Sequence, residues 1–202
     1  MRRCGAWPFN LAALLSMVLL LLSCAGAQTQ QVAPALEKKS VSENGVFSLP
    51  AQIAPEDCIF IQARINNSEP LWFILDTGAN RLLINSRVAK SLGLKTDGRT
   101  NVGGAGERLI EAQRANDVSF AFAGTSIPPQ TATIIALDDL EEEVGREIAG
   151  IIGFPLFNHY VVEIDFAKGK VNLHDPARFR YEGKGEVVPL LIENNHPRVM
   201  AR

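Results

Sequence analysis

The chain has 202 residues, of which 47% are hydrophobic and 21% are charged. This apolar share is ordinary for a globular protein and excludes wholesale disorder. The 20 lysines and arginines are outnumbered by 22 aspartates and glutamates, which gives a formal net charge of −2. We therefore expect no nucleic-acid partner, because phosphate binding needs a clustered basic excess. At about 150 residues per domain, the length predicts one domain and an additional segment.

Residues 1–27 have the composition of an export signal. Residues 1–3 are a short basic start, and Leu11–Leu22 is a nearly unbroken apolar run. The run is shorter than the roughly 20 apolar residues that span a bilayer, and it has the proportions of a secretory signal peptide. We therefore expect an exported protein; an uncleaved membrane helix is the weaker alternative.

Two cleavage sites compete in this signal. Ala25–Ala27 fits the small-x-small pattern of an ordinary signal peptidase. Leu21–Cys24 instead resembles a bacterial lipobox, in which Cys24 would carry a lipid anchor. The expected location is the bacterial envelope, either in the periplasm or anchored to a membrane and facing the periplasm.

The cysteines and histidines indicate no metal site. Without the signal, Cys58 is the one remaining cysteine unless Cys24 is retained, and it is predicted to be a small buried hydrophobic residue. No Cys/His spacing is typical of zinc. The acidic run Asp138–Glu143 is predicted to be a solvated loop or helical turn. Neither a metal nor a cofactor is expected.

Three segments follow the signal. Residues 28–52 are predicted to be a polar tether, residues 53–175 a folded lobe, and residues 176–202 a linker with further strands. The strand pattern itself begins at about Val46.

β-strand patterns dominate the lobe. Cys58–Ile65 is rich in β-forming residues, Leu71–Leu75 is apolar throughout, and Val118–Phe122 alternates. Val161–Phe166 and Val171–Leu173 flank a short polar turn, which predicts a hairpin. The predicted class is mainly β with one or two short helices.

One helix has clear start and stop signals. Asn85 or Ser86 can cap its first turn, Ala89 and Leu92 share a face, and Gly93 stands where the chain must leave the helix.

Asp76 is the first candidate for chemistry, because it directly follows the apolar run Leu71–Leu75. A carboxylate in this position is costly unless the strand ends at a cleft. Gly78 permits a sharp turn whose N–H groups can hold the carboxylate, and Thr77 can place a hydroxyl behind it. Asp-Thr-Gly also occurs in surface turns, but the apolar strand before it favours a functional site.

A second motif, Gly150–Gly153, is an apolar run broken by glycines, which indicates close backbone approach. Together with Asp76–Ala79 before it and Ile164–Phe166 after it, this motif order resembles the retropepsin-like aspartic proteases, and more narrowly the exported bacterial aspartyl protease family. The resemblance covers about Ile53 to Asp175.

The resemblance implies a closed retropepsin-like (acid protease) β lobe with Asp76 as the catalytic aspartate, in a loop completed by Thr77 and Gly78. It also implies that Ile151–Gly153 packs across this loop and that Asn101–Glu107 is a flap that closes over the substrate. The substrate-binding residues expected in the flap are Gly103, Gly104, Ala105 and Gly106. A flexible hairpin without this role is the alternative.

The chemistry of this family needs two carboxylates that share one proton, since close carboxylates cannot both ionise cheaply. Asp76 is one, so the other must come from a homodimer partner or a second lobe. The expected reaction is hydrolysis of a peptide or protein substrate by a water molecule that the aspartates activate. The alternative is a non-catalytic, membrane-tethered peptide-binding module of the same fold.

An internal repeat bears on the source of the second carboxylate. Ile65–Pro70 aligns with Ile192–Pro197 at an offset of 127 residues, which would place the counterpart of Asp76 one residue beyond Arg202. We therefore expect the C-terminal segment to contain the first strands of a truncated second lobe, including a strand over Val187–Ile192. A terminal strand that completes the lobe or a dimer sheet is the alternative.

Overall fold

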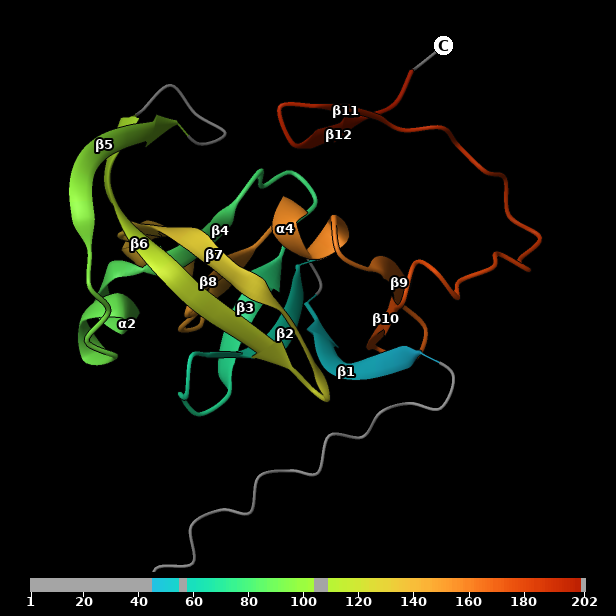
Figure 1. The fold of residues 1–202 in the computed structure, drawn as a ribbon, viewed down its shortest axis with the longest axis horizontal. Helices are drawn as coiled ribbons and strands as arrows, with labels where there is room; N and C mark the ends of the chain where they lie inside the picture. The colour runs from blue at the N-terminus through green and yellow to red at the C-terminus, as the bar shows by residue number, and fades with distance from the viewer. Residues whose placement is uncertain (1–44, 55–57, 104–108, 201–202) are drawn as a thin grey trace, which may run out of the picture. The chain divides into compact units, whose positions relative to one another are not determined.

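The computed structural model describes residues 45–54, 58–103 and 109–200 (Figure 1). The strands are β1 (Val46–Ile53), β2 (Ile59–Ile65), β3 (Leu71–Leu75), β4 (Leu82–Asn85), β5 (Asp97–Gly103), β6 (Leu109–Phe122), β7 (Thr125–Ile135), β8 (Gly150–Ile152), β9 (Val161–Asp165), β10 (Lys170–His174), β11 (Leu191–Glu193) and β12 (His196–Arg198). The helices are α2 (Ser86–Ser91), α3 (Asp138–Val144) and α4 (Phe154–Phe157). The predicted mainly β class is confirmed. Within the described residues, no helix has the length and apolar character needed to cross a membrane.

The main sheet closes on itself. Its strands are neighbours in the order β6-β7-β4-β8-β3-β2, and β2 pairs again with β6 through Arg64 with Ala121 and Ile65 with Phe120. The pairs β3–β8 and β4–β7 are parallel, so the ring is mixed. Figure 1 shows β6 and β7 crossing in front of the other strands of the ring. Closure leaves these strands without a free edge, and the closed lobe implied by the resemblance is confirmed.

β1 begins at Val46, where the strand pattern of the sequence begins, and lies within the segment predicted as the tether. Its first half pairs with β10 and its last residues pair with β2. Leu49 is buried, and Phe47 and Ala51 pack against the same core, so alternate residues of this strand face inward. Residues 46–52 therefore belong to the sheet and not to the tether predicted over 28–52, because a half-apolar strand resembles a linker when its partners are unknown.

The local elements with turn and cap signals lie where the sequence predicts them. The side chain of Asn85 accepts a hydrogen bond from the backbone N–H of Arg87 and caps α2, and Gly93 has a φ of 63° just after the helix. β9 and β10 form the predicted hairpin, in which Asp165 pairs with Lys170.

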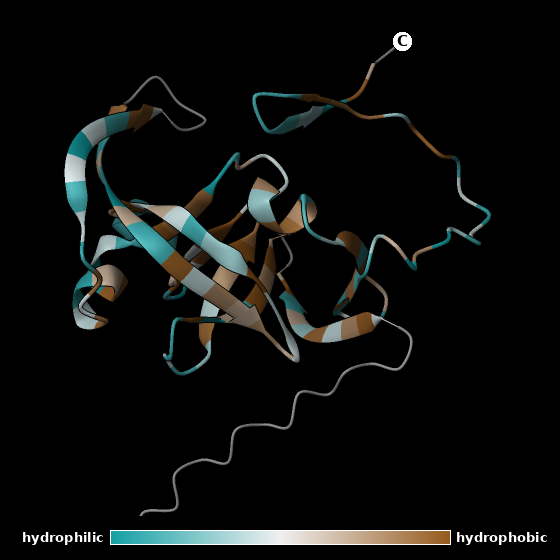
Figure 2. Ribbon diagram, in the orientation of Figure 1, coloured by the Kyte–Doolittle hydropathy of each residue, from teal (hydrophilic) through white to brown (hydrophobic). Residues whose placement is uncertain are grey.

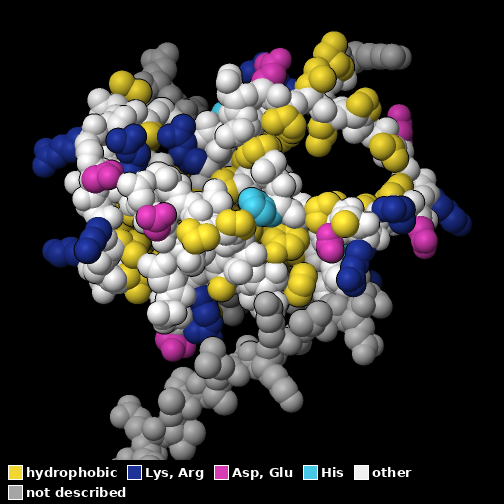
Figure 3. Space-filling model, viewed as in Figure 1, with side chains coloured by type: hydrophobic (Ala, Val, Ile, Leu, Met, Phe, Trp, Pro, Cys, Tyr) yellow, Lys and Arg dark blue, Asp and Glu magenta, His cyan; other side chains and the backbone are white. Residues whose placement is uncertain are grey.

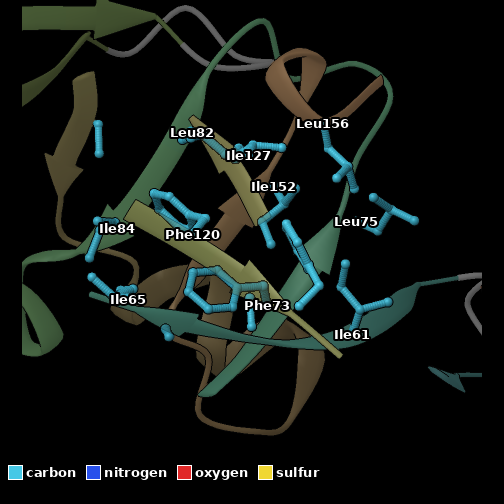
Figure 4. Packing of buried hydrophobic residues seen from close by; sticks show 14 of the residues in the cluster. Ile61, Ile65, Phe73, Leu75, Leu82, Ile84, Phe120, Ile127, Ile152 and Leu156 are labelled. Atoms are coloured by element: carbon cyan, nitrogen blue, oxygen red, sulfur yellow. The ribbon is translucent and has the colours of Figure 1, made fainter. Parts of the chain in front are cut away.

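The core fills the inside of the ring (Figure 4). Phe73 of β3 and Phe120 of β6 are fully buried and meet edge to face, with ring centres 5.9 Å apart. Leu75, Leu82 and Ile152 lie on the same inner side of their strands. Outside this core, β5 is polar along nearly its whole length, and Figure 2 draws it mostly in teal and white.

The C-terminal segment forms a small separate hairpin of β11 and β12. Asn194 and Asn195 both have positive φ at its tip, as a two-residue turn between twisted strands requires. The predicted strand over Val187–Ile192 begins only at Leu191, because no strand pairs with residues 187–190 within the described chain. Apolar side chains of this segment are exposed, and they include Val187 at 75% and Met200 at 81% (Figure 3).

Candidate active site

Asp76 stands at the end of β3 in a tight loop fixed by backbone hydrogen bonds. Its N–H donates to the carbonyl of Ile152 at 3.0 Å, and its carbonyl accepts from the N–H of Ala79 at 3.3 Å. Its carboxylate Oδ1 accepts from the N–H of Gly78 at 2.7 Å. The half-buried carboxylate is thus oriented by its own loop, as the sequence predicts for Gly78.

Gly150 at the start of β8 and Gly153 just after it allow close backbone contacts with β4 and with the aspartate loop. A Cβ on Gly150 would lie 1.9 Å from the carbonyl oxygen of Leu83, and one on Gly153 would lie 2.2 Å from that of Ala79. The N–H of Phe154 also donates to the carbonyl of Ala79 at 2.8 Å. Only glycine allows these backbones to approach so closely. The segment Ile151–Gly153 therefore packs against the aspartate loop, as the resemblance implies.

An apolar row lies next to Asp76 on the outer side of the ring. Ile74 pairs with Ile151 of β8, which pairs in turn with Leu83 of β4. These three residues belong to a second apolar cluster, whereas Phe73 and Leu75 face the inner core. Asp76 directly follows β3, the strand that carries Ile74. The apolar row therefore lies on strands that end at or beside the aspartate loop.

The other predicted site residues are placed as follows. Thr77 and Gly78 are exposed in the loop. Gly103 is the last residue of β5 and pairs with Leu109 of β6, so the described part of the predicted flap, Asn101–Gly103, belongs to the end of this strand pair. Gly104, Ala105 and Gly106 lie outside the described residues. The described hydrogen bonds do not join Gly103 to Asp76, so its role in substrate binding stays a prediction.

Helix α3 covers part of the apolar cluster, which the sequence did not lead us to expect. Leu140 and Val144 of α3 pack on the cluster that contains Phe60 and Ile74. Their spacing of four residues, with Leu137 before them, is the helical signal that was available in the sequence. The acidic residues around them concealed it, because the run Asp138–Glu143 is dominated by charge.

Glu141 anchors α3 to the rest of the lobe. Its carboxylate Oε1 accepts hydrogen bonds from Arg87 at 2.8 Å and from the N–H of Ile148 at 2.7 Å. The hydrogen bond and the charge of Glu141 raise the pKa of Arg87. Among the described residues, no group of His, Cys, Asp or Glu side chains gathers as a metal site would require.

Residues 61–156 match the model of a family described as aspartyl protease, a range that contains both Asp76 and Gly150–Gly153. Among solved structures, the chain is similar to a retropepsin-like aspartic protease from Rickettsia conorii, with 21% identity over 64% of this chain and 92% of that one, at a TM-score of 0.44. It is also similar to the retroviral protease-like domain of Ddi1 from Leishmania major, with 20% identity over 57% of this chain and 91% of that one, at a TM-score of 0.39. No curated protein matches the chain.

Proposed function

We propose that the chain, of which residues 61–156 match the aspartyl protease family, is an aspartic endopeptidase of the retropepsin-like type in which Asp76 is one of two catalytic carboxylates. The observation that carries the proposal is the hydrogen bonding of Asp76. Its N–H is tied to Ile152, and its carboxylate accepts from Gly78, so the acid is held in one orientation. A carboxylate positioned in this way loses little entropy when it acts on a substrate.

The second carboxylate is proposed to come from a second copy of the chain, with a second lobe as the alternative source. Two carboxylates that face each other share one proton, because both cannot be charged at close range. The charged one accepts a proton from water as the water oxygen attacks the peptide carbonyl carbon. The other donates its proton to the carbonyl oxygen. Collapse of the resulting diol breaks the C–N bond: the leaving nitrogen takes the proton that the first carboxylate accepted from water, and the second carboxylate takes back a proton from a diol hydroxyl.

The apolar row supports a preference for apolar side chains next to the cleaved bond. Ile151 and Leu83 are only partly buried. Ile151 pairs with Ile74 of β3, the strand that ends just before Asp76, and Leu83 pairs with Ile151 from the other side. An apolar substrate side chain that covers them would gain roughly 25 cal/mol per Å² of apolar surface removed from water.

Asp76→Asn tests the proposal. This variant should fold normally and lose peptide cleavage down to the background rate, measured with a quenched fluorescent peptide library across acidic and neutral pH. Asp117→Asn is the matched control: Asp117 is exposed with a φ of 55°, a conformation that asparagine adopts readily. Cleavage that survives Asp76→Asn would refute the proposal.

Dependence on concentration tests the source of the second carboxylate. If two copies of the chain together form the active site, the specific activity should rise with protein concentration. Sedimentation should then show a dimer. Mixing wild-type protein with an excess of Asp76→Asn protein should then suppress the activity of the wild type. Activity independent of concentration contradicts the homodimer.

A non-catalytic peptide-binding module is the second candidate, because the 202 residues contain one Asp-Thr-Gly sequence. It predicts a monomer that binds peptides without turnover. Retained peptide affinity in wild-type protein that shows no cleavage under any condition would favour it.

We also propose that the protein acts in the bacterial envelope, on the basis of the basic start and the apolar run Leu11–Leu22. Cell fractionation of wild-type protein and of Cys24→Ala distinguishes a lipid anchor on Cys24 from ordinary signal-peptide cleavage. Loss of membrane association would indicate the lipid anchor, and unchanged release into the periplasm would indicate ordinary cleavage.

A further inference from the structure

Arg81 is brought beside the candidate active site by strand register. β8 runs parallel to β3, with Leu75 opposite Ile152, so Asp76 is level with Gly153. β8 runs antiparallel to β4, with Leu83 opposite Ile151, so Arg81 is also level with Gly153. A Cβ on Gly153 would lie 2.7 Å from the carbonyl oxygen of Arg81, which confirms that the two backbones are adjacent.

Arg81 and the loop of Asp76 meet at Gly153. Asp76 directly follows β3, and Arg81 directly precedes β4. A Cβ on Gly153 would also lie 2.2 Å from the carbonyl oxygen of Ala79, so the loop that carries Asp76 and the backbone of Arg81 approach the same glycine. Because β8 lies between β3 and β4, two strand spacings separate the backbones of Asp76 and Arg81 by about 10 Å.

The guanidinium of Arg81 has unused hydrogen-bonding capacity. It is exposed, and its Nε donates to Oδ1 of Asn80 at 2.7 Å. Within the described residues Arg81 has no carboxylate partner, whereas several arginines elsewhere are paired with acids: Arg64, Arg87, Arg99, Arg114, Arg178 and Arg198. The bond to Asn80 orients the side chain and leaves its two terminal nitrogens available. A planar guanidinium in this state matches a carboxylate with two parallel hydrogen bonds.

We propose that Arg81 is a specificity residue that selects peptide substrates with an acidic side chain two or three residues from the cleaved bond. This inference rests on the proposed protease function of Asp76. An extended peptide advances about 3.3 Å per residue. The backbones of Asp76 and Arg81 are about 10 Å apart, which corresponds to about three residues of an extended peptide. With the added reach of the two side chains, Arg81 can therefore contact an acidic side chain two or three residues from the cleaved bond.

A matched peptide series tests the proposal on the full chain. The peptides keep one cleaved bond and carry Glu, Gln or Lys at each of the second to fourth positions on either side. For the best position, kcat/KM should be roughly two- to fivefold higher with Glu than with Lys, the size expected of a solvent-exposed ion pair. The preference should weaken as the salt concentration rises.

Charge reversal supplies the decisive comparison. Arg81→Glu should invert the preference to Lys, and Arg81→Gln should abolish it. Lys95→Glu, which makes the same change of charge at an exposed position between α2 and β5, should keep the preference for Glu. The role of Arg81 would be overturned if Arg81→Glu left the preference for Glu unchanged, or if no position showed a preference. Cleavage of the peptides would still support the protease function.

A binding measurement separates the two proposals if wild-type protein cleaves none of the peptides. That result contradicts the protease function. Fluorescence anisotropy of the same labelled peptides with Asp76→Asn protein then tests Arg81 alone. If the Glu peptide binds more tightly than the Lys peptide and Arg81→Glu reverses this order, the result supports a subsite at Arg81 for an acidic side chain. Equal binding of the Glu and Lys peptides refutes it.

Discussion

The guanidinium of Arg87 lies 2.8 Å from the carboxylate of Glu141. This contact joins α2 to α3, two short helices that are far apart in the sequence. The side chain of Glu141 is only 14% exposed, and it also accepts a hydrogen bond from the N–H of Ile148, just before β8. The carboxylate of Glu141 therefore links α3, which packs on the outer apolar cluster, to the segment that leads into β8 next to the aspartate loop.

Glu141→Ala should destabilise the lobe by about 1–3 kcal/mol, because it leaves the N–H of Ile148 and the guanidinium of Arg87 without their acceptor. The free energy of unfolding in urea measures the effect. Glu143→Ala, at an exposed position of the same helix, should change it by no more than about 0.5 kcal/mol. Equal effects of the two variants would show that Glu141 does not anchor α3.

Gly153→Ala should destabilise the protein at the upper end of roughly 1–3 kcal/mol, because the new Cβ would overlap the carbonyl oxygen of Ala79, which is backbone and cannot move aside. Urea unfolding and circular dichroism measure the loss. Gly103→Ala is the control, since a Cβ there would meet its nearest neighbour, a leucine methyl, at 3.9 Å. Unchanged stability of Gly153→Ala would mean that β8 does not brace the loop.

Arg146→Lys should cost about 1 kcal/mol. The guanidinium of Arg146 lies 4.5 Å from the ring centre of Phe60 and 4.7 Å from that of Trp72, and it donates to Gln52 at 2.6 Å. A lysine keeps the charge but loses the flat surface that stacks on the two rings. Thermal unfolding should show a lower Tm for this variant, whereas Arg99→Lys, at an exposed position on β5, should leave the Tm unchanged.

Glu163 should contribute to stability in a pH-dependent way. Hydrogen bonds from Asn172 and His174, each 2.9 Å long, lower the pKa of its carboxyl group. The folded protein therefore takes up this proton less readily than the unfolded chain. The stabilisation is complete above the pKa of the unfolded chain and is lost as the pH falls through the lower pKa of the folded protein.

Glu163→Gln should thus lower the Tm at neutral pH and have a shrinking effect as the solution is acidified. The difference in stability should stay below about 1 kcal/mol, because the side chain is 52% exposed. Glu186→Gln, at an exposed position in the C-terminal segment, is the control. An effect of Glu163→Gln that grows in acid would contradict the direction of the pKa shift.

The sequence predicted those elements whose signals are local. The side chain of Asn85 caps the start of α2, and Gly93 takes the positive φ that follows its end. The N–H of Gly78 donates to the carboxylate of Asp76 two residues away. The apolar strand before Asp76 and the glycines of β8 were also visible, because close backbone packing requires particular residue types wherever it occurs.

The elements that depend on distant partners were less visible. β5 is polar and is a strand because β6 pairs with it. β7 contains Pro128 and Pro129, which argue against a strand; they fall between Ile127 and Gln130, where the pairing with β6 shifts register. The position of Arg81 beside Asp76 likewise emerges only when β8 is placed between their strands.

The pairing of β1 with β10 has a consequence for how the chain is made. Val46 pairs with His174, and Leu49 pairs with Val171. The ribosome must therefore synthesise almost the entire lobe before most of the first strand can find its partner, and pairing between such distant segments is slow. Until then the apolar residues of β1 stay exposed and can associate with other incompletely folded chains.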